Sequence, residues 1–351
     1  MMTKMDVDQV RQRLRSRKTE ERIQAVRMAA GMEPGQRQEL LLEAMADRSS
    51  YVAALAAEAL GDGADDRAAR AMVERFGSLG EDGVKRDPGC QIRANLAFAL
   101  GRLEHRPAAD VLRAGIRTVQ VEPVGGVPLD TATHLRANCA LALAQLRDAD
   151  AVRDIALLLF DRRGHALRGV RPDPTLTVEP RKAAARALAL TGSVAARLPL
   201  TLRLVHPENE TPEVLQECMQ ALVDLEDPHA LEVLEPYLGH DDARLAAFAA
   251  LIIARTQAPE AAALLGAAIQ RLSGDPLRAT VLALTTLRTP EAYALLHELA
   301  RAEREQVRLA AIGALPSDAA SRELLEGLAA RDPSPRVRAA ALSALREGGG
   351  C

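Results

Sequence analysis

The chain repeats one short phrase, and the most complete copy runs from Asp332 to Leu345 as DPSPRVRAAALSAL. Aligning all copies on their closing Ala-Leu gives one anchor residue per copy, and these anchors recur about every 30–45 residues. The anchors are Ala30, Leu60, Leu100, Leu143, Leu188, Leu222, Leu251, Leu284, Leu315 and Leu345. A period of this length is the mark of a solenoid of stacked helical repeats.

The pattern inside the phrase predicts an anchor helix in every copy. Alanine precedes the anchor residue throughout, and small or apolar residues recur four, seven and eight positions before it, which places them on one helical stripe. Small residues at a fixed point of this stripe let neighbouring helices approach closely. A second, companion helix follows each turn. The sequence therefore predicts an all-α fold, an α-solenoid of about ten helix pairs over residues 1–346, with a flexible tail at 347–351.

Residues 6–16 form a predicted N-terminal capping helix with Val7, Val10 and Leu14 on one side. Terminal repeats need a polar outer face, which this charged helix provides. An alternative is that its basic residues contact an acidic partner; these are Arg11, Arg13, Arg15, Arg17 and Lys18.

Three copies place an Asp six residues before an Arg: Asp87 and Arg93, Asp130 and Arg136, Asp332 and Arg338. With the Ala-rich stripe, this opening resembles the HEAT-repeat family, most closely the short, Ala-rich repeats of the PBS-lyase type. The resemblance implies a structural ladder of Asp–Arg pairs between successive repeats. Three copies depart from it: Ala53 stands where Arg is expected, Arg22 stands where an apolar residue is expected, and Asp275-Pro276 lies four residues closer to its anchor than Asp332-Pro333 does.

Composition argues against a nucleic-acid partner. The formal net charge is −3, whereas duplex binders normally carry a basic excess that neutralises phosphates. Aromatic residues make up 2% of the chain, which is too few for the base-stacking sites of HEAT-like DNA glycosylases. The N-terminal residues contain no apolar signal core and no apolar run is long enough to span a bilayer, so we expect a cytoplasmic protein without membrane contact. Abundant Arg and Ala are typical of GC-rich bacterial genomes.

No motif predicts an enzyme, a metal site or a cofactor. The seven His lack the convergent spacing that zinc requires, the glycines of the first enlarged loop lack P-loop spacing, and no G-x-S-x-G is present. Cys139 and Cys218 fall on the apolar stripe and are predicted to be buried small residues.

The copies between Leu60 and Leu188 carry enlarged loops at residues 77–89, 118–130 and 161–180. All three follow a companion helix and precede an anchor helix, so they should project side by side from one edge of the solenoid. Such insertions frequently form a binding face.

From these loops and the adjoining helices we predict a partner-binding site. Its residues are Lys85, Arg86, Asn95, Asn138, Arg162, Arg163, His165, Arg168 and Arg171. The third loop could grip carboxylates or phosphates, although solvated arginines in a GC-rich gene would look the same. The two Asn could equally hydrogen-bond neighbouring loop backbone.

These features together favour a non-enzymatic adaptor or regulatory scaffold that binds another protein through its concave surface and middle loops. An alternative implied by the resemblance is an accessory subunit of a modifying enzyme, similar to a bilin lyase; nucleic-acid binding ranks third. The last repeat leaves Val337, Leu342 and Leu345 partly open, which predicts possible self-association through the C-terminal repeat.

Overall fold

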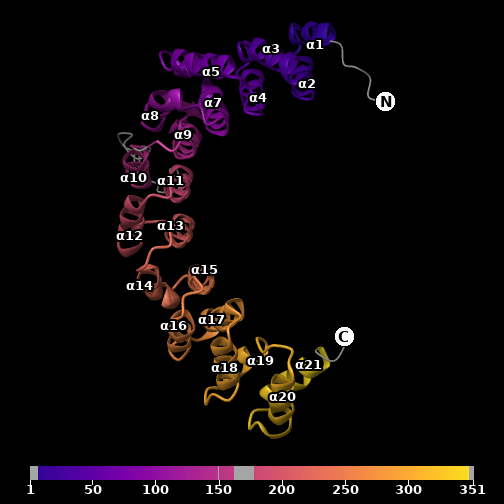
Figure 1. Cartoon of the computed structure of the whole chain (residues 1–351), viewed down its shortest axis with the longest axis vertical. Coiled ribbons are helices and arrows are strands. Elements are labelled where there is room, and N and C mark those ends of the chain that lie inside the picture. Colours follow the sequence, from indigo (N-terminus) through magenta and orange to yellow (C-terminus); the bar gives the residue numbers. More distant parts are fainter. Residues whose placement is uncertain (1–6, 149, 162–177, 348–351) are drawn as a thin grey trace. The chain divides into compact units, whose positions relative to one another are not determined.

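The computed structural model describes residues 7–148, 150–161 and 178–347, and it confirms an all-α solenoid of helix pairs (Figure 1). The chain divides into two compact units, residues 1–203 with 207–221 and residues 204–206 with 222–351. The prediction of a single domain over residues 1–346 stays a prediction.

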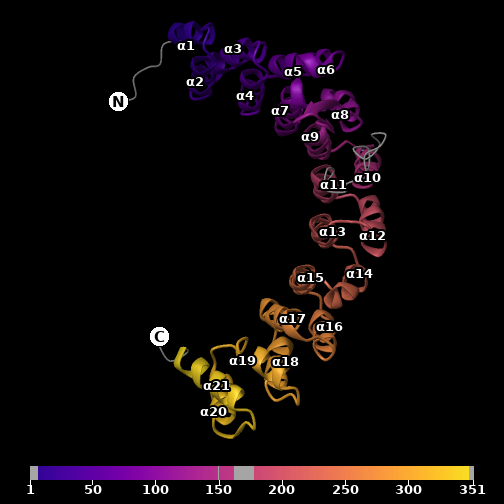
Figure 2. The ribbon, with the colours of Figure 1, turned by 180° about the vertical axis from the view of Figure 1, so that it is seen from behind.

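In the first unit, anchor helices α2, α4, α7, α9, α11 and α13 lie in one layer and companion helices in the other (Figures 1 and 2). Helices α12 and α13 also contribute residues to the second unit. The elements are α1 (Val7–Leu14), α2 (Thr19–Ala30), α3 (Pro34–Met45), α4 (Ser50–Leu60), α5 (Asp66–Leu79), α6 (Gly83–Arg86), α7 (Gln91–Arg102), α8 (Ala109–Ile116), β1 (Val121–Val124), β2 (Val127–Asp130), α9 (Thr133–Gln145), α10 (Ala151–Leu159), α11 (Val178–Leu190), α12 (Arg197–Val205) and α13 (Pro212–Asp224).

The second unit continues the same alternation, with anchor helices α15, α17, α19 and α21. Its elements are α14 (Ala230–Leu234), α15 (Ala243–Arg255), α16 (Ala261–Ile269), α17 (Gly274–Leu287), α18 (Pro290–Leu299), α19 (Glu305–Ile312), α20 (Ala319–Arg331) and α21 (Pro335–Glu347). Helices begin where the sequence offers caps: Asp242 accepts hydrogen bonds from two backbone N–H groups of α15, and Thr289 caps α18 ahead of Pro290.

The predicted capping helix at 6–16 is α1, which buries Val10 and Leu14. It packs against α2 as α3, α8 and α10 pack against α4, α9 and α11, the anchor helices that follow them. The cap is therefore also the first member of the first helix pair.

Close approach of neighbouring anchor helices explains the small residues of the phrase. A Cβ on Gly61 would lie 3.1 Å from Cα of Ala99, and one on Gly101 would lie 2.8 Å from Cα of Ala142. Each glycine directly follows its anchor residue, and each alanine directly precedes the next anchor. Two helices can therefore meet almost backbone to backbone at this level.

The structure corrects the alignment of two copies. Leu251 is 43% exposed while Ile253 is fully buried, so Ile253 is the anchor of α15 and Ile252, not alanine, precedes it. In the first copy Ala29 is fully buried, so Ala29 replaces Ala30 as the anchor. The anchor position only needs to be buried and filled by a small or aliphatic side chain. An alignment on the letters Ala-Leu therefore misplaces it where another such residue fills it.

The predicted Asp–Arg ladder is present and mostly joins successive repeats. Arg22, Arg136 and Arg308 are buried, and their Nε atoms lie 2.8, 2.9 and 2.9 Å from carboxylate oxygens of the next repeat. Those carboxylates belong to Asp47, Asp161 and Asp332. The six-residue pairs Asp87–Arg93 and Asp130–Arg136 also form, at 2.8 and 2.6 Å. Copy two needs no Arg of its own at Ala53, since Arg22 already pairs with Asp47.

The last predicted pair differs from the others. Arg338 donates to the backbone oxygens of Asp332 and Pro333 rather than to a carboxylate, and the Asp332 side chain pairs with Arg308.

Replacing Gly101 with Ala should lower the free energy of unfolding by about 1–3 kcal/mol, because the added methyl group meets the α9 backbone and overpacks the contact. Gly35→Ala on α3 is the matched control, since no atom lies within 4 Å of a Cβ there, and it should be neutral or stabilising by up to about 1 kcal/mol. Urea titrations followed by circular dichroism measure both. Equal midpoints for the two variants would contradict the close contact.

Candidate functional site

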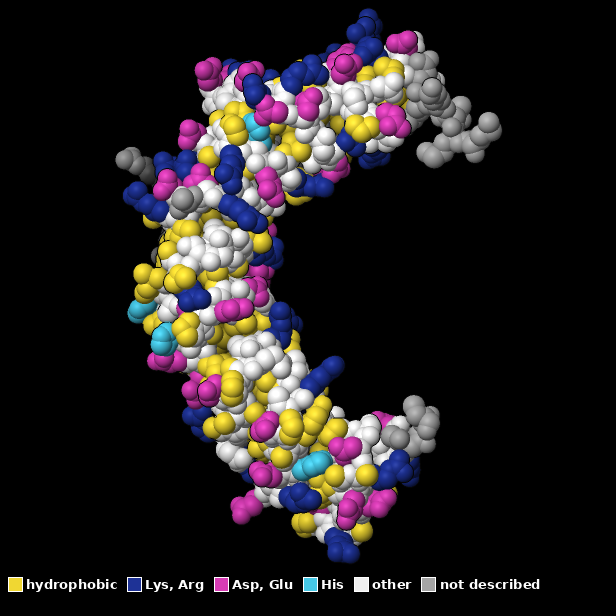
Figure 3. All heavy atoms as spheres, in the orientation of Figure 1, with side chains coloured by type: hydrophobic (Ala, Val, Ile, Leu, Met, Phe, Trp, Pro, Cys, Tyr) yellow, Lys and Arg dark blue, Asp and Glu magenta, His cyan; other side chains and the backbone are white. Residues whose placement is uncertain are grey.

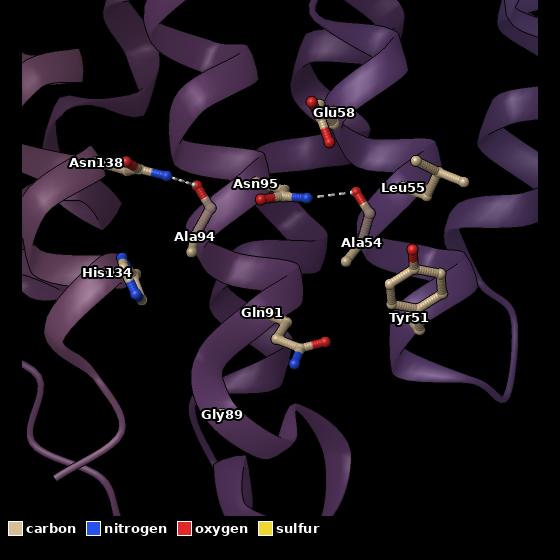
Figure 4. A pocket seen from close by; sticks show the side chains of 10 residues that line it. All are labelled: Tyr51, Ala54, Leu55, Glu58, Gly89, Gln91, Ala94, Asn95, His134 and Asn138. Carbon is tan, nitrogen blue, oxygen red and sulfur yellow. Dashed lines mark hydrogen bonds between the residues drawn. The ribbon is translucent and has the colours of Figure 1, made fainter. Parts of the chain in front are cut away.

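The exposed face of the anchor-helix layer, called here the anchor face, is set by residues nine, five and two positions before each anchor residue. Offsets of this size put side chains on one stripe of a helix. On α4, α7 and α9 these positions line a hollow of about 380 Å³ (Figure 4). We call it the anchor-face hollow; the residues at these positions are Tyr51, Leu55 and Glu58 of α4, Gln91 and Asn95 of α7, and His134 and Asn138 of α9.

Both predicted asparagines lie in this hollow. Nδ2 of Asn95 donates to the carbonyl oxygen of Ala54 on α4, and Nδ2 of Asn138 donates to that of Ala94 on α7, each at 2.9 Å (Figure 4). The acceptors are helical carbonyls, which have a second lone pair available. The expected bond to backbone is thus real, but it reaches the preceding anchor helix instead of a loop.

These bonds fix the orientation of both amides. Because each Nδ2 faces a carbonyl, Oδ1 points the other way, and within the part of the chain that the structure describes neither Oδ1 has a hydrogen-bond donor. The hollow therefore offers two oriented acceptors, one on each of two consecutive anchor helices.

The first two enlarged loops lie side by side, as predicted. The N–H of Gly89, which lines the hollow, donates to Oε1 of Glu122 at 2.8 Å, and Gln120 Nε2 donates to the Asp87 carbonyl at 3.0 Å. Arg93 adds a bond to Gln120 Oε1 at 2.6 Å. The edge of the hollow is therefore held in place by the second loop.

The second loop is a β-hairpin, which the sequence interpretation missed. Strands β1 and β2 pair in antiparallel register, Val121 with Asp130 through Val124 with Val127, around Gly125 and Gly126 at positive φ. Two glycines between β-branched residues are a hairpin signal that could have revealed it. In the first loop, residues 77–79 belong to α5, so the loop is shorter than predicted.

The predicted basic residues are not gathered in the hollow. Lys85 and Arg86 lie on α6, exposed, where Lys85 pairs with Asp82 at 3.5 Å and Arg86 donates to the Ser78 carbonyl at 2.6 Å. The five basic residues predicted in the third loop lie outside the described residues; they are Arg162, Arg163, His165, Arg168 and Arg171. The sequence interpretation also passed over Tyr51, Glu58, Gln91 and His134, although their offsets from the anchors mark them.

The described thiols are buried, as predicted for Cys139 and Cys218. Burial raises the pKa of Cys90 to about 12 and raises the pKa values of the other two as well. In residues 7–148, 150–161 and 178–347, no group of three or more His, Cys, Asp or Glu side chains could hold a metal ion. None of the helices found there is both long and apolar enough to cross a membrane.

A larger hollow of about 780 Å³ lies between companion helices α10 and α12. Its apolar part includes Phe160, 42% exposed and stacked beneath the Arg203 guanidinium at 4.0 Å, and Leu198, 64% exposed. In its charged part, Arg117 donates to Asp154 at 2.6 Å. Among its described acceptors, the Asp154 carboxylate is therefore already engaged by Arg117.

Comparison with known proteins settles the fold. No family model and no curated protein matches the chain. Among solved structures, Kap121p bound to Pho4p aligns with 97% of this chain at 12% identity and a TM-score of 0.50. The fold is that of a HEAT-repeat solenoid. The chain covers 40% of the Kap121p chain, so the likeness concerns part of that protein.

Two other solenoids align less closely. The CpcE–CpcF complex of phycocyanin lyase from Nostoc sp. PCC7120 shares 19% identity, with 80% of this chain and 94% of that one covered and a TM-score of 0.39. Human deoxyhypusine hydroxylase shares 18% identity, with 80% and 95% covered and a TM-score of 0.33. At these identities the likeness concerns the fold alone.

Glu122 should make the stability of the hollow's edge, where it holds Gly89, depend on pH. Burial opposes its ionisation, but hydrogen bonds from Gln120, Thr131 and the Gly89 N–H outweigh burial and lower the pKa of Glu122. Its stabilising contribution is therefore complete above the ordinary glutamate pKa of about 4.3 and is lost as the pH falls through the lower folded value.

Glu122→Gln keeps an acceptor oxygen but removes the charge, so the variant should be less stable by about 0.5–1 kcal/mol at pH 7. The difference from wild type should persist to about pH 5 and be lost as the pH falls below the ordinary glutamate pKa and through the lowered folded pKa, as measured by urea titrations over this range. The exposed Glu81→Gln of the first loop is the control and should match wild type throughout. A pH-independent difference would show that the charge of Glu122 does not anchor the wall.

Proposed function

We propose that this protein is a non-enzymatic adaptor whose anchor-face hollow binds an extended segment of another protein. The observation that carries the proposal is the pair of oriented, unused amide oxygens of Asn95 and Asn138 on consecutive anchor helices. The proposal keeps the predicted class of function and moves the site from the basic loops to the anchor face.

The spacing of these oxygens suits a polypeptide backbone. Packed helices lie roughly 8–10 Å apart, so the two oxygens recur at about that interval. A polyproline II segment turns once every three residues with a rise of about 3.1 Å per residue, which gives a repeat of about 9 Å. Its backbone has no internal hydrogen bonds, so one N–H per turn is available for each oxygen.

The remaining lining fits a protein ligand as well. Tyr51 exposes 52% of its surface beside the half-buried Leu55, and both are positioned by a rigid helix. Tyrosine supplies much contact area at a small cost in conformational entropy. Kap121p, which shares the fold, was solved with the protein Pho4p bound.

Charge is distributed in a way that favours protein over nucleic acid. On the face seen in Figure 3, basic and acidic side chains are interspersed, and among the described residues no Lys or Arg lines the anchor-face hollow. Duplex binding relies on many phosphate contacts from clustered basic residues. The bilin-lyase-like alternative and the cytoplasmic location remain predictions, and visible absorbance of the purified protein would reveal a bound chromophore.

Selection of random linear peptides against the purified protein tests the proposal. Gln91→Trp places a bulky ring in the hollow from an exposed position and should weaken the selected peptides at least about tenfold, or ~1.4 kcal/mol, in fluorescence anisotropy. Gln36→Trp is the matched control, because Gln36 is equally exposed in the first turn of companion helix α3. Peptides that bind Gln91→Trp as tightly as wild type, or no enriched peptides, would overturn the proposal.

A further inference from the structure

One stripe of α4 forms a complete side of the anchor-face hollow. Tyr51, Leu55 and Glu58 are spaced i, i+4 and i+7, so they follow one another along the same side of the helix (Figure 4). The stripe passes from an exposed aromatic ring through a half-buried aliphatic side chain to an exposed carboxylate. An apolar path that ends in one negative charge matches the shape of a long basic side chain.

The carboxylate of Glu58 is available to a ligand. Glu58 is the one acidic residue among the described residues that line the hollow. In the described part of the chain no ion pair or side-chain hydrogen bond engages this carboxylate, in contrast to Asp62 nearby, which pairs with Arg102 at 2.6 Å. The charge is therefore uncompensated at the point where a bound segment would pass.

We infer that the segment bound in the anchor-face hollow presents a lysine or arginine side chain to this stripe. Its ammonium or guanidinium group pairs with Glu58, and its aliphatic stem lies against Leu55, as long basic side chains commonly do. The exposed ring of Tyr51 lies at the opposite end of the stripe, about 10 Å from Glu58, where it packs against the bound segment itself. The inference rests on the proposed function, since it specifies the residue that the extended segment carries.

The inference reverses the partner charge expected from the loops. Lys85 is paired with Asp82 and Arg86 is occupied by the Ser78 carbonyl, so neither positive charge is directed into the hollow. A glutamate or aspartate at the same place in the ligand would instead meet Glu58 without a compensating positive charge.

The peptide selection that tests the proposed function also tests the charge preference. Wild type should enrich Lys and Arg over their input frequency, and Glu58→Lys should abolish this enrichment and favour Asp and Glu. Glu74→Lys, an equally exposed residue on companion helix α5, is the control and should select like wild type.

For one enriched peptide, replacing its Lys or Arg with norleucine should weaken binding to wild type about 3–5-fold at low salt. The same replacement should change binding to Glu58→Gln less than twofold, and the wild-type preference should shrink as salt screens the pair.

Two outcomes separate the inference from the proposed function. Peptides that are lost with Gln91→Trp but show neither Lys nor Arg enrichment, or no coupling to Glu58, would overturn the inference and leave the adaptor proposal intact. If no enriched peptide is sensitive to Gln91→Trp, the proposed function fails and the inference fails with it.

Discussion

A row of buried arginines is the constraint on which the repeat architecture depends. A buried guanidinium carries five donors and cannot lose its charge, so it must be surrounded by acceptors. Arg308 shows the solution: its Nη1 donates to the carbonyls of Ala302 and Glu303 in the turn before its helix, while Nε faces Asp332 of the next repeat at 2.9 Å. In the repeats that carry it, such an arginine ties one helix start to the following repeat, and this requirement fixes where that following repeat places its opening acid.

The enlarged loops meet the same requirement by different means. Arg93 donates to Gln120 in place of a carboxylate from the next repeat. Arg136 donates to the Thr118 carbonyl in addition to pairing with two aspartates. Both acceptors flank the hairpin that also holds Gly89 through Glu122. The insertions are therefore integrated into the ladder, and in being so they position one edge of the anchor-face hollow. Structure and candidate function meet at these shared hydrogen bonds.

Sequence reasoning succeeded where one residue type answers one physical need. In most copies the Ala before the anchor is dictated by packing distance, so it could be predicted from the phrase, whereas the Asp–Arg ladder followed from the resemblance to HEAT repeats. The sequence prediction failed where several residue types can fill one buried position. Ile253 serves as the anchor as well as leucine does, and the Ala-Leu pattern does not reveal it. It also failed at Gly125 and Gly126, which signal a β-hairpin, because the otherwise helical pattern favours an irregular loop there. Of the residues that line the anchor-face hollow, Asn95 and Asn138 stand out in the sequence as unusual, whereas Tyr51 and Glu58 are marked only by their offset from the anchor.

The anchor faces of the two units differ in chemistry, and this difference clarifies what the hollow is suited to recognise. In the second unit the equivalent positions, five residues before the anchors of α15 and α17, are Phe248 and Ala279. Such positions can offer only apolar contact. In the first unit Asn95 and Asn138 replace small or apolar residues, and each donates one amide hydrogen to a backbone carbonyl of the preceding anchor helix. That bond holds the acceptor oxygen in place before any ligand arrives, which lowers the entropic cost of binding. A preoriented pair of acceptors beside a single uncompensated carboxylate recognises a backbone and one basic side chain, a combination that a purely apolar face cannot distinguish.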